Sequence, residues 1–157
     1  MSASDPRSSA NPKHHSAQSA AAIEQQINEL VQQSRVYEAY LNDVMTRQVT
    51  VARMLEEARL ASSTIQATSP ESQIDSLMPI GIGVHIHATV PPVKKLLVNL
   101  GAGVAVEKSR DDALNFVEAR IKEFEVAARQ LEAQRAELAM RMQQLQSQVN
   151  QLLRGAQ

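Results

Sequence analysis

The chain has no cysteine and no tryptophan. Apart from four histidines, its aromatic residues are two tyrosines and two phenylalanines. Without cysteine, a disulfide scaffold, cysteine-ligated zinc or iron–sulfur sites and thiol catalysis are excluded. The 157 residues suggest one domain at most. Because a compact globule of this length normally buries several aromatic side chains, an elongated helical protein is favoured.

Long hydrophobic runs and an excess of one charge are also missing. No segment approaches the ~20 consecutive apolar residues that cross a bilayer, and the net charge is −1. This charge gives no electrostatic case for binding nucleic acid or an anionic membrane. We therefore expect a cytoplasmic protein whose partners include neither of these.

The chain has five glycines and six prolines, and two long stretches contain neither residue. Neither occurs between Lys13 and Ser69 or between Val104 and Arg154. Since they cost a helix interior roughly 1 and 3 kcal/mol relative to alanine, these stretches predict long helices over residues 23–68 and 110–154. Ser109 is the expected cap of the second helix. Residues 1–22, rich in Ser and Ala, are expected to be a disordered tail.

Both stretches carry apolar residues at alternating steps of three and four. In the first, ten of thirteen positions are apolar: Ile23, Ile27, Leu30, Ser34, Tyr37, Leu41, Val44, Gln48, Val51, Leu55, Ala58, Ser62 and Ile65. In the second, eleven of twelve are apolar: Leu114, Val117, Ile121, Phe124, Ala128, Leu131, Arg135, Leu138, Met142, Leu145, Val149 and Leu152. A helix on a globular core would drift off such a repeat within a few turns, so these two seams predict a coiled coil.

The segment 74–108 between the helices has the chemistry of β-strands. Val84, Ile86 and Ala88 alternate with polar residues, which predicts a strand. Three further short strands are predicted, at Leu77–Ile80, Lys95–Leu100 and Val104–Val106. Gly-x-Gly at residues 81–83 and 101–103 suits tight turns with positive φ. Pro91-Pro92 is expected in the connection between the hairpins. The predicted order is helix, hairpin, hairpin, helix.

Two motifs resemble ligand sites only weakly. His85-x-His87 places two imidazoles on one strand face, but no Asp, Glu or Cys close in sequence completes a metal site, so a solvent-facing polar edge is favoured. Gly101-Ala-Gly103 lacks the further residues of a phosphate-binding loop. No pattern of catalytic residues falls in a plausible pocket. We expect no metal, no cofactor and no enzymatic activity.

Two segments stand out: Leu77-Met-Pro-Ile-Gly-Ile-Gly-Val-His-Ile-His-Ala88 and Leu97-Val-Asn-Leu-Gly-Ala-Gly-Val-Ala-Val-Glu-Lys-Ser109. The second is followed by Asp112-Ala-Leu-Asn-Phe116 at the start of the predicted helix. Together these segments resemble the alpha class of the prefoldin family. The resemblance implies an ATP-independent chaperone, a hexamer of two alpha-class and four beta-class subunits. It also implies coiled-coil arms on a body of inter-subunit β-barrels, with unfolded chains held at the arm ends and delivered to a group II chaperonin.

A passive coiled-coil tether or scaffold is the alternative that periodicity alone leaves open. Such a protein would end in a folded docking module or a basic patch, whereas this chain ends in apolar heptads and glutamine. Suppression of aggregation of a denatured client without nucleotide would separate the two.

Two surfaces follow from these expectations. Strand edges around Val84–Thr89 and Leu96–Leu100 should pair with each other and with neighbouring subunits, because short hairpins are marginal alone. The proposed oligomerisation residues are Val84, Ile86, Ala88, Leu96, Leu97, Val98, Leu100, Val104 and Val106. The proposed client-binding residues at the arm tip are Ile23, Ile27, Leu30, Leu145, Val149, Leu152 and Leu153.

The register of the arm can also be predicted. The β segment between the helices is short and reverses the direction of the chain, so the helices should be antiparallel. If Ile65 lies opposite Leu114, Leu30 lies opposite Val149. Arg135 then meets Val44, and Gln48 meets Leu131. These polar residues should loosen the arm while helping to set its register.

Overall fold

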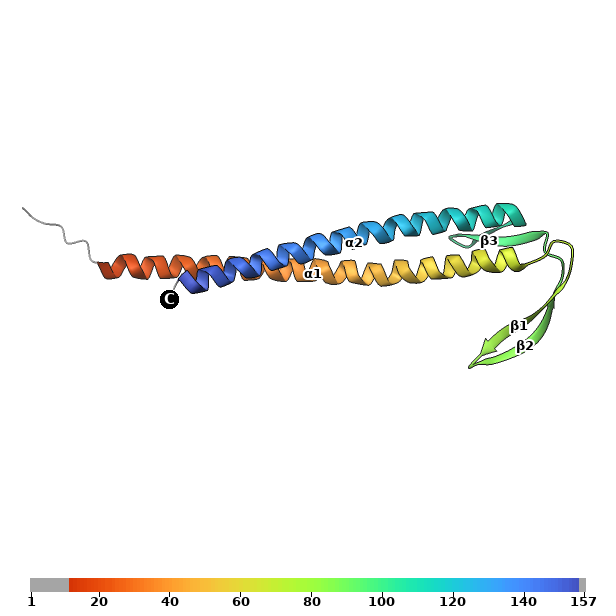
Figure 1. Cartoon of the computed structure of the whole chain (residues 1–157), viewed down its shortest axis with the longest axis horizontal. Coiled ribbons are helices and arrows are strands. Elements are labelled where there is room, and N and C mark those ends of the chain that lie inside the picture. Colours follow the sequence, from red (N-terminus) through yellow and green to blue (C-terminus); the bar gives the residue numbers. More distant parts are fainter. Residues whose placement is uncertain (1–11, 156–157) are drawn as a thin grey trace, which may run out of the picture. The chain divides into compact units, whose positions relative to one another are not determined.

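The computed structural model describes the backbone of residues 12–155 and the side chains of residues 19–155. Along the chain, a long helix is followed by two hairpins and a second long helix, in the order predicted (Figure 1). The elements are α1 (Pro12–Ala67), β1 (Ile74–Gly81), β2 (Val84–Val90), β3 (Lys95–Gly101), β4 (Val104–Ser109) and α2 (Arg110–Gly155).

The first helix begins earlier than its seam. α1 starts at Pro12, eleven residues before Ile23, so the expectation of a disordered tail is wrong for residues 12–22. Proline suits the first helical position because its missing N–H would be unpaired there anyway, and the alanines of this segment have the highest helix propensity. The expectation for residues 1–11 falls outside the described residues.

Burial follows the two predicted seams closely. All thirteen seam positions of α1 are buried or half-buried, as are eleven of the twelve in α2. Val44, Leu131 and Leu145 are 7%, 9% and 7% exposed. Arg135 is the exception, because its side chain is exposed. A long charged side chain reaches water at little cost, whereas the shorter Gln48 stays half-buried.

The chain divides into two compact units. The arm unit holds residues up to Met45 and from Ala133 onward, and the base unit holds Thr46–Glu132. In the arm unit, Leu30, Leu145 and Val149 line one hollow between the two helices. The Arg141 guanidinium lies 5.9 Å from the centre of the Tyr37 ring. Both contacts agree with the predicted antiparallel register, in which Leu30 meets Val149.

Within the base unit, too, two links join α1 to α2. An Arg59 nitrogen lies 2.9 Å from a Glu125 carboxylate oxygen, which ties α1 to α2 across their exposed flank. A second link joins the Arg110 guanidinium to the Gln66 carbonyl at 3.2 Å. These pairs place the C-terminal half of α1 beside the N-terminal half of α2, as an antiparallel pair requires.

The four strands form two separate two-stranded sheets, β1–β2 and β3–β4. The expectation that β2 and β3 also pair with each other within the chain is therefore wrong. The connection explains this result: Pro91 and Pro92 have no N–H to donate, and the Val93 N–H donates to the Ser69 carbonyl at 2.9 Å. The linker is thereby attached to the end of α1, and the edges of both hairpins stay unpaired in the described chain.

Both hairpins close through the same kind of turn. Ile82 and Gly83 have φ of 49° and 74°, and Ala102 and Gly103 have φ of 50° and 79°. Positive φ at both central residues is the pattern of a type I′ turn, for which Asn-Gly is the preferred pair. A β-branched residue is a genuine outlier in this region, at a cost on the order of 1–3 kcal/mol. Ile82 is therefore the most strained turn residue described.

Candidate assembly and client-binding surfaces

Hairpin β1–β2 exposes an apolar surface on a short two-stranded sheet. Met78 lies opposite Ile86 on one face, and Leu77 lies opposite His87 on the other. The exposed apolar side chains include the predicted Val84 and Ile86, while Ala88 is half-buried. The sequence predicts this partner strand and the turn, but the proposed oligomerisation residues leave out their exposed apolar side chains: Leu77, Met78, Ile80 and Ile82.

The hydrophobic pattern of β1 could have revealed them. Its residues run Leu-Met-Pro-Ile before the turn. Side chains opposite each other in a two-stranded sheet lie on the same face, so the apolar residues of β1 extend the apolar surface of β2. The candidate assembly surface is therefore larger than predicted.

Hairpin β3–β4 has one shielded face and one open face. Leu96, Val98, Val106 and Lys108 share the half-buried face, where Val98 lies opposite Val106. Leu97 is 72% exposed on the other face, and the predicted Leu100 and Val104 are also exposed. The proposed oligomerisation residues thus fall into two groups, one half-buried and one exposed.

The proposed client-binding residues differ in accessibility. Leu153 is 50% exposed, as expected for a residue that directly follows the seam. Leu145 is 7% exposed, so it closes the coiled coil and does not belong to an accessible surface. The remaining five are half-buried: Ile23, Ile27, Leu30, Val149 and Leu152. An apolar contact surface at the tip therefore centres on Leu153, with the half-buried residues beside it.

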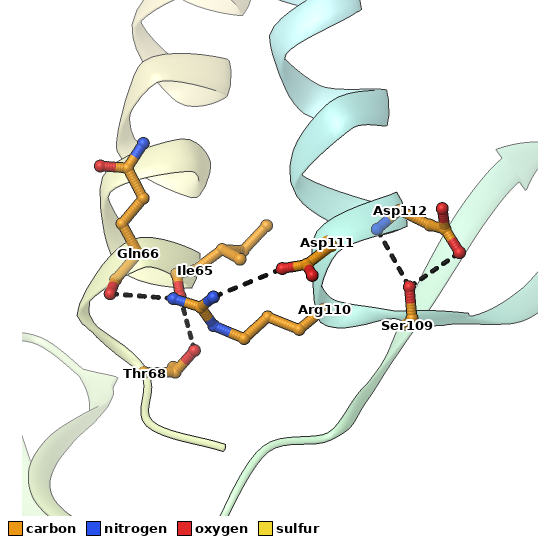
Figure 2. Close-up of polar contacts among 7 residues, drawn as sticks. All are labelled: Ile65, Gln66, Thr68, Ser109, Arg110, Asp111 and Asp112. Carbon is orange, nitrogen blue, oxygen red and sulfur yellow. Dashed lines mark hydrogen bonds and ion pairs between the residues drawn. The ribbon is translucent and has the colours of Figure 1, made fainter.

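A polar junction joins the end of α1 to the start of α2 (Figure 2). The Ser109 hydroxyl accepts the Asp112 N–H at 3.1 Å and donates to the Asp112 carboxylate at 2.7 Å, so Ser109 caps α2 as predicted. The Thr68 hydroxyl donates to the Ile65 carbonyl at 2.6 Å. The Arg110 guanidinium donates to the Gln66 carbonyl, and its Nη1 lies 3.6 Å from the Asp111 carboxylate.

Arg110 has two electrostatic roles at this junction. Its positive charge lies beside the last carbonyls of α1, where a helix end is electronegative. It also lies in the first turn of α2, where a cation is unfavourable, but Asp111 and Asp112 share that turn. Its Nε is buried without a hydrogen-bond partner among the described residues. Sequence patterns could not reveal this link, because Gln66 and Arg110 are 44 residues apart.

We predict that Arg110→Ala lowers the free energy of unfolding by about 1–2 kcal/mol, since it removes a charge-assisted hydrogen bond whose donor is mostly buried. Urea unfolding followed by circular dichroism measures the change. Arg59→Ala is the matched control, because its ion pair with Glu125 is exposed and should contribute less than about 1 kcal/mol. Equal losses in the two variants would contradict a special role for Arg110.

The weaker motifs gain no support as sites. His85 and His87 are both exposed, and His85 Nδ1 lies 3.1 Å from the Gly83 carbonyl oxygen. Among the described residues, no group of three or more His, Cys, Asp or Glu side chains could hold a metal ion. Within the same residues, neither helix has a segment both long and apolar enough to span a bilayer.

The fold and its exposed surfaces define a class: proteins in which an antiparallel pair of long helices carries β-hairpins that expose apolar side chains. Residues 18–155 match the sequence pattern of the prefoldin subunit family. The chain belongs to the prefoldin family, whose members are chaperones rather than enzymes.

Several relatives agree with the alpha class. "Prefoldin subunit alpha" of Nitrosopumilus maritimus is 37% identical over 134 residues, which cover 85% of this chain and 92% of the relative. "Prefoldin subunit alpha" of Methanocorpusculum labreanum is 30% identical, with 84% and 90% covered. The resemblance found from the two hairpin segments is therefore confirmed.

Two solved structures share the fold. One is a filamentous prefoldin from Methanocaldococcus jannaschii, with a TM-score of 0.59, 22% identity, and coverage of 77% of this chain and 98% of that chain. The other is the prefoldin beta subunit from Thermococcus strain KS-1, with a TM-score of 0.59, 20% identity, and coverage of 82% and 93%. Both confirm two long helices joined through β-hairpins as the architecture.

Proposed function

We propose that this chain is a subunit of an ATP-independent cytoplasmic chaperone that captures unfolded polypeptides and delivers them to a group II chaperonin. Membership of the prefoldin family, with alpha subunits as relatives over most of the chain, is the observation that carries the proposal. Its working form is a hexamer of two copies of this chain and four beta-class subunits. The hairpins of these subunits form the β-barrel body.

The exposure of the hairpins supports this assembly. Leu97 is 72% exposed and Val84 54% exposed, on sheets of two strands that are marginal alone. A neighbouring chain that adds strands to these edges would pair their free backbone groups and cover their apolar side chains. Two hairpins per chain offer more edges than one and suit this chain to the centre of a complex.

The arm tip supports capture. Leu153 is 50% exposed, and half-buried Leu152 and Ile23 lie in terminal turns, which open at almost no free-energy cost. Each apolar contact with a client contributes about 1–2 kcal/mol, and several arms acting together multiply the effect. Binding is therefore weak for one arm, broad in specificity and independent of ATP.

Light scattering from a chemically denatured enzyme diluted into buffer without nucleotide tests the proposal. The chain mixed with a beta-class subunit should suppress aggregation at near-stoichiometric concentration. A passive tether would leave the scattering unchanged, and that result would overturn the chaperone function. Transfer is tested separately by adding a group II chaperonin with ATP, which should recover enzyme activity from the captured client.

A further inference from the structure

The last three turns of α2 carry no charged side chain. No Asp, Glu, Lys or Arg occurs from Met142 to Leu153, whereas thirteen of the 32 residues from Arg110 to Arg141 are charged. Glutamine has about the same helix propensity as Glu or Lys, and ion pairs at i,i+4 stabilise an exposed helix. Formation of the helix therefore does not by itself account for the glutamines that replace charged residues at this end.

Five of the uncharged polar side chains line one hollow of about 450 Å³ along α2, together with Met140. We call these five the amide face: Gln143, Gln144, Ser147, Gln148 and Gln151. All five are exposed, and none forms a side-chain hydrogen bond with another described residue. Nearby, Gln146 Nε2 donates to Asn150 Oδ1 at 3.4 Å. The amide face thus presents donors and acceptors that the described chain does not use.

A second hollow, on α1, differs in its charge. It is lined by Ala21, Glu24, Gln25, Asn28, Glu29 and Gln32. The Gln25 amide donates to the Glu29 carboxylate at 3.3 Å, so one of its amides is already engaged. Two carboxylates would repel an acidic polypeptide and attract a basic one, whereas the hollow on α2 does neither.

The groups of the amide face match those of a peptide backbone. A primary amide offers two N–H donors and a carbonyl acceptor. Every non-proline residue of an unfolded chain exposes one N–H and one C=O, whatever its side chain. Met140, 62% exposed, and Leu153, 50% exposed, provide apolar contacts on the same helix. A polypeptide held there can pair its backbone with the amides while its apolar side chains meet these two residues.

We propose that the amide face binds the backbone of an unfolded client by hydrogen bonds. The inference rests on the capture of clients proposed above and adds the part of the client that is recognised. Because both partners in these hydrogen bonds are neutral and the backbone is common to all sequences, recognition does not depend on the charge or the sequence of the client.

Methionine variants distinguish hydrogen bonding from apolar contact. Gln144→Met together with Gln148→Met keeps the length and helix propensity of both side chains and removes their amides. If apolar area alone held clients, the variant would bind them more tightly. We expect it to bind an unfolded client about fivefold or more weakly, the loss expected for two hydrogen bonds. The matched control is Gln130→Met with Gln134→Met, an exposed pair at the same spacing outside the hollow, which should change the affinity less than about twofold.

A pair of peptides tests the same point without a variant. Both are fluorescently labelled and unfolded, and they have identical side chains, but one is N-methylated at alternate backbone nitrogens. Fluorescence anisotropy measures their binding to the chain assembled with a beta-class subunit. The unmodified complex should bind the methylated peptide about fivefold or more weakly, because the missing N–H groups cannot pair with the amide carbonyls. Gln144→Met with Gln148→Met should reduce this difference.

Each other outcome contradicts the proposal. Equal or tighter binding by Gln144→Met with Gln148→Met, or equal losses in the control pair, would overturn recognition through the amide face. An undiminished preference of that variant for the unmethylated peptide would also overturn it. If the unmodified complex protects a denatured enzyme but binds both peptides equally, backbone recognition falls and the chaperone function stands. If it binds neither peptide and protects no enzyme, the proposed function itself falls.

Discussion

Removing residues 1–27 together with 146–157 is expected to abolish protection of a denatured client while leaving the hetero-oligomer assembled. The deletion removes most of the accessible apolar surface proposed at the tip, including Leu153, which is 50% exposed. It leaves the base unit, Thr46–Glu132, and both hairpins untouched. Because each contact is weak and capture depends on several arms, losing the tips should reduce protection more than tenfold.

Light scattering measures the protection, and gel filtration with light-scattering mass detection measures the assembly. Deleting residues 1–11 alone is the length control and should leave protection unchanged. Leu153→Gln is the sharper variant, since it removes one exposed side chain and should weaken protection several-fold without loss of helicity. A truncated complex that protects as well as the full-length one would move the client site to the hairpins or to the flanks of the helices.

Leu97→Pro is expected to abolish the hexamer and leave separate subunits with nearly unchanged helical content. Leu97 lies in the middle of β3, opposite Glu107 of β4. Proline has no N–H to donate and holds φ near −65°, so it disrupts the ladder in which it sits. The helices form their hydrogen bonds internally, so circular dichroism at 222 nm should change little.

Gel filtration with the beta-class subunit reads out the loss of assembly. Leu97→Ala is the matched control, because it keeps the backbone N–H and removes only the side chain beyond Cβ. It should assemble, with an affinity reduced by the lost apolar contact. An unchanged elution volume for Leu97→Pro would contradict assembly through this strand.

Most of the fold was predictable because its signals are local and repeated. The seam from Ile23 to Ile65 coincides with the shielded face of α1, and the Gly-x-Gly motifs coincide with the two turns. Ser109 caps α2 as its position before Asp112 suggested. Each of these features depends on residues a few positions apart, so short-range chemistry is enough to specify it.

The errors arise where short-range signals compete or leave alternatives. Composition suggested disorder for residues 12–22, yet the alanines of that segment also favour a helix, and α1 includes it. The 3-4 repeat placed Arg135 in the seam, but a long charged side chain can leave the seam for water. Leu145 was assigned to the client surface because of its nearness to the end of the chain, whereas its partner helix buries it.

The sequence alone determined the two helices, their antiparallel seam, the hairpin turns and the family, because heptad spacing, glycine placement and capping all act over one or two turns of chain. Only the tertiary structure decided which edges stay open. β2 and β3 do not pair with each other, and the Val93 N–H between them donates to the Ser69 carbonyl. Arg110 reaches the Gln66 carbonyl from 44 residues away. Such contacts depend on where distant segments lie in space. The exposure of Ile82 is likewise a property of the folded turn, since the sequence shows the residue but not what surrounds it.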